Sequence, residues 1–314
     1  MAGDKNWYSK VLGLHCDGTN GSTTFTDVKS KTVTANGNAQ ISTAQYPSIT
    51  GKTSSAYFDG TGDYLSLSDS SDWSFGTENF TLRCKARFDT SNPDYQTLFS
   101  QFNTTSNWWF IRKEEASNNK MTVYFRIGGT VKASYTMTNS WSSFSTGTWY
   151  DIEAVRYGSS IYLFIDGASQ TLTATTAVST NDVGDVSSPL YIGSDTTYPF
   201  KGYLSEVEIY KGVALHNSNF TPTSSPFPDE YVSVSGTTKD VSGAFVSRLV
   251  RVYRQDTGAF VGEQLSNGTT GAYKITAANT GATVTKHFAI MHDDDANPPT
   301  TTENALIYDN ITPT

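Results

Sequence analysis

The chain has 314 residues, of which 37% are hydrophobic, 13% aromatic and only 17% charged, and its net charge is −8. This length suits two domains with sizeable cores. An acidic, lightly charged chain has no general attraction for phosphate backbones or anionic lipids, so we expect neither nucleic acid nor a membrane as a partner. No apolar run approaches the roughly 20 residues that a membrane-spanning helix needs.

Short stretches of alternating apolar and polar residues, bounded by turn residues, predict strands up to residue 210. They are residues 11–14, 56–58, 64–67, 80–88, 97–102, 108–112, 121–127, 149–157, 161–165, 190–192 and 202–210. One short helix is predicted at residues 69–75, where Asp69, Ser70 or Ser71 can cap it. So many short strands favour a two-sheet sandwich.

Two cysteines, Cys16 and Cys84, are too few for a disulfide scaffold or a zinc framework. Within residues 80–88 apolar and polar residues alternate, and Cys84 falls on the apolar face. Cys16 is in phase with Leu14. We therefore expect both to be small buried hydrophobes, with free thiols favoured over a disulfide.

Three prolines mark a predicted linker at residues 220–230. Strands resume after it at residues 232–236, 249–254, 260–265, 272–277, 286–292 and 305–308. We therefore expect an all-β chain with an N-terminal arm (residues 1–10), a large first domain (residues 11–219), the linker, and a small β-sandwich (residues 231–314).

Several segments of the first domain follow one another in a characteristic order. They read LGLHCDG from Leu12, YFDGTGDYL from Tyr57, FTL from Phe80, WY from Trp149, LFIDG from Leu163, LYIG from Leu190 and GYLSEVEIY from Gly202. Together they resemble the laminin-G-like, concanavalin A-like superfamily over about residues 11–227. The resemblance implies a lectin-type two-sheet jelly roll.

Residues 234–237, 250–258, 271–275 and 304–309 resemble carboxypeptidase-regulatory-like modules, which are small Ig/transthyretin-like β-sandwiches. The two domains in this order look like proteins carried on tailed-bacteriophage particles. The first residues, MAGDKNW, contain no apolar signal core, so we expect synthesis in the host cytoplasm without a signal peptide. This expectation fits virion proteins, which are released by lysis.

Many laminin-G-like domains hold one calcium ion, and the resemblance points to Asp27 and Glu206 as its ligands. A structural calcium is the one cofactor to consider. After Asp27 the chain reads VKSK, which has two lysines and no glycine. That sequence favours turn-forming acids without a metal. Asp293, Asp294 and Asp295 are a second acidic group, for which a solvated turn is favoured.

Glucanases with this fold need two carboxylates about 5 Å apart on one strand. The family's acidic triplet is absent from this sequence. Glu206 and Glu208 are two residues apart on one predicted strand, but no third acid continues the row. We therefore expect no catalytic residues and a polar outer face at this position.

Carbohydrate binding by this fold uses exposed aromatic rings and loop polar groups. The candidates are Trp108 and Trp109, which are adjacent on one strand and so face opposite ways, together with Trp141 and Tyr198 in loops. Core or rim packing is the alternative for each of them.

The leading hypothesis is a non-enzymatic surface protein of a tailed-bacteriophage virion, either a capsid decoration or a tail-associated component. Its partners would be other virion proteins and host or environmental glycans, and the expected assembly is a homo-oligomer, with a trimer favoured. One alternative is a secreted or virion carbohydrate-active enzyme of the glucanase type. Another is a purely structural virion subunit that binds no sugar.

Overall fold

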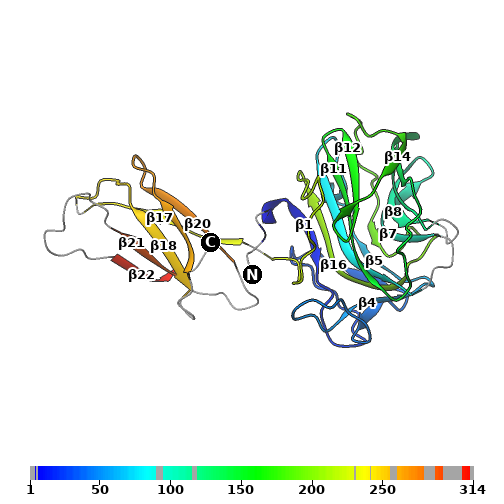
Figure 1. Cartoon of the computed structure of the whole chain (residues 1–314), viewed down its shortest axis with the longest axis horizontal. Helices are drawn as coiled ribbons and strands as arrows, with labels where there is room; N and C mark the ends of the chain where they lie inside the picture. Colours follow the sequence, from blue (N-terminus) through cyan, green and yellow to red (C-terminus); the bar gives the residue numbers. More distant parts are fainter. Residues whose placement is uncertain are drawn as a thin grey trace. The chain divides into compact units, whose positions relative to one another are not determined.

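The computed structural model describes residues 4, 6–89, 95–114, 119–229, 231–240, 242–254, 260–278, 287–292 and 306–311. The chain divides into two compact units (Figure 1). The larger unit is Tyr8–Phe227, and the smaller one combines Met1–Trp7 with Pro228–Thr314. Among the described residues, no helix is long and apolar enough to cross a membrane.

Strands make up most of the regular structure of the larger unit. They are β1 (Lys10–Leu14), β2 (Thr34–Asn36), β3 (Gln40–Ser42), β4 (Ser55–Asp59), β5 (Tyr64–Leu67), β6 (Phe80–Phe88), β7 (Gln96–Thr104), β8 (Asn107–Lys113), β9 (Met121–Ile127), β10 (Thr130–Met137), β11 (Trp149–Tyr157), β12 (Ser160–Ile165), β13 (Ala168–Ser169), β14 (Leu172–Thr176), β15 (Leu190–Ile192) and β16 (Lys201–Lys211). Two 3₁₀-helices, η1 (Trp7–Ser9) and η2 (Ser71–Trp73), complete the list. Within residues 69–75, where a short helix is predicted, the structure has only the three-residue 3₁₀-helix η2, and the Ser70 hydroxyl accepts a hydrogen bond from the Asp72 amide at its start.

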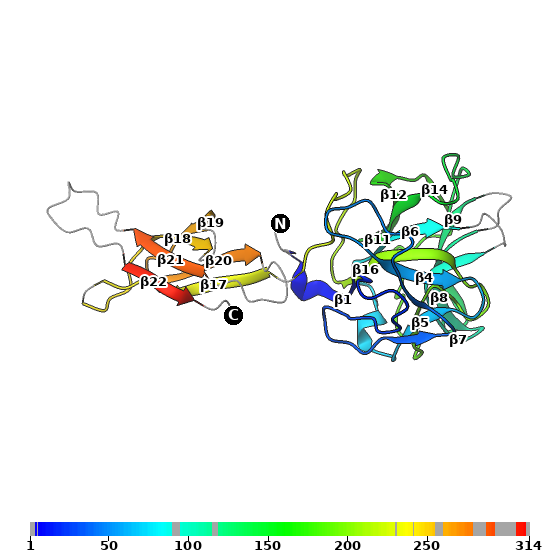
Figure 2. The same ribbon diagram turned by 90° about the horizontal axis from the view of Figure 1, so that it is seen from below.

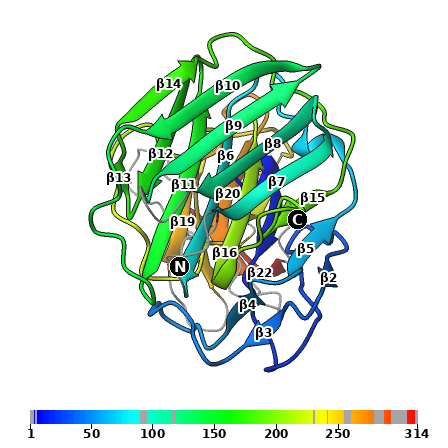
Figure 3. The same cartoon turned by 90° about the vertical axis from the view of Figure 1, so that its right-hand side faces the viewer.

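These strands form two antiparallel sheets. The first sheet has the order β13-β12-β11-β6-β16-β4-β3, and β1 also pairs with β16. The second sheet has the order β14-β10-β9-β8-β7-β15-β5-β2. Figure 3 shows the second sheet in front of the first. The predicted all-β, two-sheet jelly roll is therefore confirmed.

The core lies between the two sheets because alternate side chains of each strand point inward. On β6, Phe80, Leu82, Cys84 and Phe88 are all buried in this core. Cys16 joins the same core, and both cysteines are free thiols. Burial raises the pKa of the Cys16 thiol to about 12, so it stays protonated and inert. The prediction of buried free cysteines is confirmed.

The smaller unit contains β17 (Tyr231–Thr237), β18 (Leu249–Arg254), β19 (Phe260–Leu265), β20 (Ala272–Ala278), β21 (His287–His292) and β22 (Leu306–Ile311). A two-stranded sheet pairs β17 with β20, and a four-stranded sheet has the order β19-β18-β21-β22 (Figure 2). Among the described residues of this unit, the buried core consists of Val234, Val250, Val252, Ile275 and Ala289. Asp293, Asp294 and Asp295 lie outside the described residues.

Residues 212–227, which we call the closing segment, pack against the jelly roll. The Phe220 amide donates to the Gly167 carbonyl at 3.0 Å, and the Phe220 ring stacks on His216 with centroids 3.6 Å apart. Phe227 is only 3% exposed. Part of the segment predicted as a linker is therefore fixed on the larger unit.

We predict that Gly167→Ala destabilises the larger unit much more than Gly158→Ala. Both glycines have positive φ, +74° and +58°, which costs alanine about 1–2 kcal/mol. A methyl group at Gly167 would also overlap the Phe220 carbonyl, which adds about 1–3 kcal/mol, whereas Gly158 faces open space. Urea unfolding measures the difference, and equal losses would contradict the role of this contact.

Candidate functional site

The outer face of the second sheet carries side chains that the core does not use. On β8, Trp109 and Ile111 point into the core and are 0% and 1% exposed. Trp108, Phe110 and Arg112 alternate with them and therefore lie on the outer face. Trp108 and Arg112 are partly exposed there.

Three rings on this face form an aromatic cluster. The Phe110 ring is stacked on Trp108 and on Tyr124 of β9, with centroids 5.2 and 5.3 Å apart. The Trp108 and Tyr124 centroids are 4.7 Å apart. Phe110 is covered by its neighbours, whereas Trp108 and Tyr124 keep part of their surface exposed. Such half-buried rings offer a flat apolar surface to a ligand.

Arg112 joins this cluster to two tyrosines outside β8. Its guanidinium carbon lies 3.9 Å from the Phe110 ring centroid, 4.2 Å from that of Tyr95 and 5.2 Å from that of Tyr198. Asp195 forms an ion pair with Arg112 at 3.6 Å, and its carboxylate accepts a hydrogen bond from the Tyr198 amide at 2.8 Å. Arg112 therefore holds the loop that carries Tyr198 against the sheet.

Hydroxyl groups surround the cluster. Thr122 and Thr136 on neighbouring strands share a hydrogen bond of 2.8 Å. Thr97 pairs directly with Arg112, so both side chains lie on the same face. Thr97 is fully buried, and in the described part of the chain its Oγ1 has no hydrogen-bond partner. Thr97 and Thr122 are buried, so the part of this face that is open to a ligand consists of the Trp108 and Tyr124 rings, Arg112 and the partly exposed Thr136.

The structure brings together two of the four predicted sugar-binding residues. Trp108 and Tyr198 both belong to the arrangement around Arg112. The prediction is wrong for Trp109, which is 0% exposed in the core. It is also wrong for Trp141, which is 5% exposed because it packs against Tyr150 with centroids 4.3 Å apart. Neither ring presents a face to a ligand.

Sequence reasoning missed Arg112, Tyr95 and Tyr124. Arg112 and Phe110 occupy the same phase of β8 as Trp108, so alternation alone could have put them on its face. The contacts of Arg112 with Tyr95 and Tyr198 join residues that are distant in the sequence, so a local sequence pattern does not predict them.

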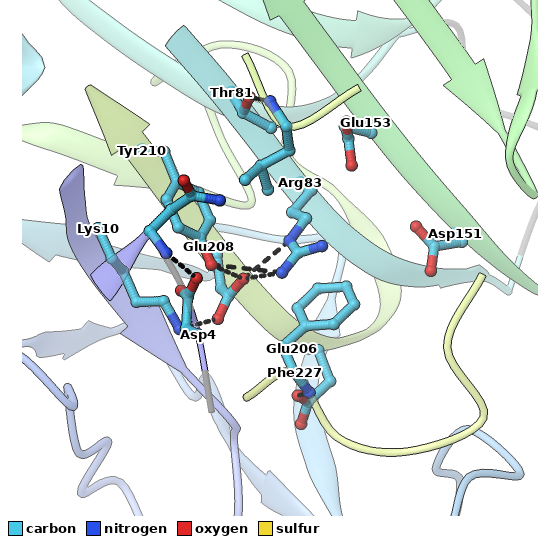
Figure 4. Close-up of polar contacts among 12 residues, drawn as sticks. Asp4, Lys10, Thr81, Arg83, Asp151, Glu153, Glu206, Glu208, Tyr210 and Phe227 are labelled. Carbon is cyan, nitrogen blue, oxygen red and sulfur yellow. Dashed lines mark hydrogen bonds and ion pairs between the residues drawn. The ribbon is translucent and has the colours of Figure 1, made fainter. Parts of the chain in front are cut away.

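On the outer face of the first sheet, buried acidic and basic side chains form an ionic layer (Figure 4). Glu208 of β16 accepts from Lys10 Nζ at 2.5 Å and from Arg83 Nε at 2.8 Å. On the neighbouring strands, Lys85 of β6 pairs with Asp151 of β11 at 2.7 Å. These carboxylates are therefore neutralised by protein cations rather than open to substrate.

The Glu206 side chain is fully buried, and three groups form hydrogen bonds or ion pairs with its carboxylate. Lys52 Nζ lies 2.9 Å and His15 Nδ1 3.0 Å from its carboxylate, and the Phe227 amide donates to it at 2.5 Å. Burial alone would raise the pKa of Glu206, but the hydrogen bond and charge of His15, with Lys52, outweigh burial and lower it. A glycosidase acid needs the opposite shift, so Glu206 does not fit that role.

The two predicted calcium ligands are structural carboxylates. Asp27 Oδ1 accepts a hydrogen bond from the Gly13 amide at 2.8 Å, and its Oδ2 accepts one from the Lys31 amide at 2.9 Å. Glu206 is occupied by Lys52, as described above. Among the described residues, no group of three His, Cys, Asp or Glu side chains could hold a metal ion. Both carboxylates are engaged by backbone amides or by protein cations, so their arrangement in this structure does not fit a calcium ion.

The family model of the Concanavalin A-like lectin/glucanases superfamily matches residues 59–218, which is just over half of the chain. The chain belongs to this superfamily. The predicted resemblance is thus confirmed for the jelly roll. No curated protein matches the chain.

Several solved structures are similar to this chain. Domain 4 of AbnA, an extracellular arabinanase from Geobacillus stearothermophilus solved with arabinotriose, is 14% identical, with 65% of this chain and 94% of that one covered and a TM-score of 0.47. The binding domain of botulinum neurotoxin DC, solved with rat synaptotagmin II, is 12% identical, with 93% and 73% covered and a TM-score of 0.48. The active domain of bacteriophage CBA120 tailspike protein 2 is 15% identical, with 67% and 31% covered and a TM-score of 0.45. Likenesses this weak say nothing about the ligand of this chain.

We predict that Lys52→Met destabilises the larger unit by about 3–5 kcal/mol near neutral pH, because it leaves the buried Glu206 carboxylate short of a partner. Lys31→Met is the matched control, since its ion pair with Asp72 is partly exposed and should contribute no more than about 1 kcal/mol.

The ion pair between Lys52 and Glu206 should stabilise the larger unit only within a range of pH. The pKa of Glu206 is lowered from 4.5, so its contribution is present above that pH and is lost as pH falls through the lowered value. Burial would lower the pKa of Lys52, but Glu206 raises it above 10.5, so the lysine's contribution is lost only as pH rises beyond that value. Urea unfolding against pH tests this window, and a Lys52→Met loss that persists unchanged into strong acid would contradict it.

Proposed function

We propose that the jelly roll binds saccharides on the outer face of its second sheet. The observation that carries this proposal is the cluster of Trp108 and Tyr124 stacked on Phe110, which Arg112 links to Tyr198. Sugar rings stack on partly exposed aromatic faces, while hydroxyl and charged groups beside the rings bond the sugar hydroxyls. Trp108 supplies the largest ring, and Arg112 is a positioning residue that holds Tyr198.

The binding is non-enzymatic in this proposal. A retaining glycosidase needs one accessible carboxylate and one protonated acid. Glu206 and Glu208 have neighbouring places on β16, but both are buried and paired with lysine, arginine or histidine. The rival, a carbohydrate-active enzyme, would be favoured by sugar release from a polysaccharide panel that Glu206→Gln abolishes.

We further propose that the protein is carried on the surface of a tailed-bacteriophage particle, on the capsid or the tail, and is made in the host cytoplasm. Support comes from the domain order, a lectin-type jelly roll followed by a small β-sandwich that we assign to the carboxypeptidase-regulatory-like modules. The smaller unit would bind other virion proteins, and a homotrimer would match particle symmetry. A purely structural subunit that binds no sugar is the alternative.

We expect Trp108→Ala and Tyr198→Ala each to weaken binding of a glycan identified on an array by about tenfold, because each removes one stacking ring. Isothermal titration calorimetry measures the change. Tyr162→Ala is the matched control, since Tyr162 is a partly exposed aromatic on the outer face of the first sheet. An array without any ligand would favour the purely structural alternative.

We expect mass spectrometry of purified particles to detect this chain in a fixed ratio to the major capsid or tail protein. Treatment that strips loosely bound protein should leave that ratio unchanged. Absence of the chain from intact particles would contradict the virion proposal but would leave the saccharide proposal standing.

A further inference from the structure

The first sheet carries its own row of aromatic and planar polar side chains, and we propose that this row binds a neutral, extended saccharide. The row consists of Gln40, Tyr57, Tyr203, Arg87 and Trp149, and we call it the cross-strand row. The cross-strand row lies on the first sheet, whereas the aromatic cluster near Arg112 lies on the second sheet. The proposal therefore adds a second binding face to the chain and does not rest on the first.

Backbone pairing puts the five residues in one line. Gln40 on β3 pairs with Tyr57 on β4, and Tyr57 pairs with Tyr203 on β16. Tyr203 pairs with Arg87 on β6, and Arg87 pairs with Trp149 on β11. Directly paired residues point to the same face, and neighbouring strands are about 4.8 Å apart. This step is close to the length of one sugar ring in an extended chain.

The line lies on the outer face of the sheet. Chain neighbours of the row members on all five strands point into the core and are buried: Ala39, Ile41, Ala56, Phe58, Leu204, Ala86, Phe88 and Tyr150. Because side chains alternate along a strand, the row members point away from the core. Gln40, Tyr57, Arg87 and Trp149 are partly exposed, and Tyr203 in the middle of the row is 8% exposed.

Contacts within the row fix its central members. The Tyr57 and Tyr203 rings have centroids 4.9 Å apart, and the Arg87 guanidinium carbon lies 5.4 Å from the Tyr203 centroid. Arg87 also donates to the Gly147 carbonyl at 3.0 Å and pairs with Asp89. Rings and a flat guanidinium held in place lose little freedom on binding, which favours affinity.

The polar groups of the row and the charges beside it favour a neutral sugar. The pKa of Tyr57 is raised, mainly by burial and also by the nearby groups of Tyr203, Asp59, Asp89 and Asp63. Its hydroxyl therefore stays protonated and can donate to a sugar oxygen. Asp89 is paired with Arg87, and Lys201 lies opposite Asp59 and acts on Asp89, so these charges offset one another. A saccharide without charge needs no counter-ion and fits this row.

The test uses the full chain and two double variants. The first-face variant combines Trp108→Ala with Tyr198→Ala, and the row variant combines Tyr57→Ala with Trp149→Ala. Calorimetry measures binding of cellohexaose, xylohexaose and, as an acidic probe, hexagalacturonate. Tyr162→Ala is the control for a partly exposed ring of the first sheet outside the row. Thermal unfolding confirms that each variant folds, and Gln40→Ala replaces the row variant if it does not.

We expect the first-face variant to keep binding at least one neutral probe, with about one site per chain, and the row substitutions to weaken that binding by about tenfold. Tyr162→Ala should leave it unchanged. The proposal is overturned if the first-face variant binds neither neutral probe, if the row substitutions have no effect, or if hexagalacturonate binds better. If only the first-face variant loses all binding, the proposal for the cross-strand row is overturned, while the proposed saccharide site on the second sheet is still supported.

Discussion

The ionic layer on the outer face of the first sheet is the interaction on which the larger unit depends. β11 and β16 supply carboxylates there, and β6 between them supplies Arg83 and Lys85. Arg83 forms its ion pair with Glu208 of β16 and Lys85 forms its ion pair with Asp151 of β11, so the two cations of β6 tie it to both neighbouring strands. Buried charges are costly unless paired, which makes the register of these three strands strict. The layer also receives the closing segment, because the Phe227 ring lies 3.7 Å from the Arg83 guanidinium.

The ionic layer also limits what chemistry the jelly roll can perform. Its carboxylates are occupied by lysine, arginine, histidine and backbone amides, so the residues that resemble a glucanase pair hold the fold together instead. What remains available to a ligand is aromatic surface. The second sheet offers Trp108 and Tyr124 with Tyr198, and the first sheet offers Tyr57 and Trp149 beyond the ionic layer. This distribution of groups is the basis of our proposal that the jelly roll binds saccharides without cleaving them.

Much of the fold could be predicted from the sequence, because alternation of apolar residues is strong in strands such as β6 and β11. Strand β10 was missed, since its sequence TVKASYTM is rich in polar and small residues and its pairing with β9 defines it. For the site, alternation showed that Trp108 and Trp109 face opposite ways but could not say which faces the core, because apolar residues flank both. The ion pairs of Glu206 were equally hidden, since Lys52 and His15 are distant in the sequence and only the tertiary fold unites them.

The most direct test of saccharide binding without catalysis is an NMR titration that follows the side-chain signals of tryptophan and arginine as an array-identified glycan is added. Trp108 and Arg112 belong to the proposed first face, whereas Trp109 and Trp141 are buried in the core. The account predicts that the Trp108 indole and Arg112 signals shift, that the Trp109 and Trp141 indoles do not, and that the glycan stays intact. Cleavage of the glycan, or shifts confined to groups near Glu206, would contradict it.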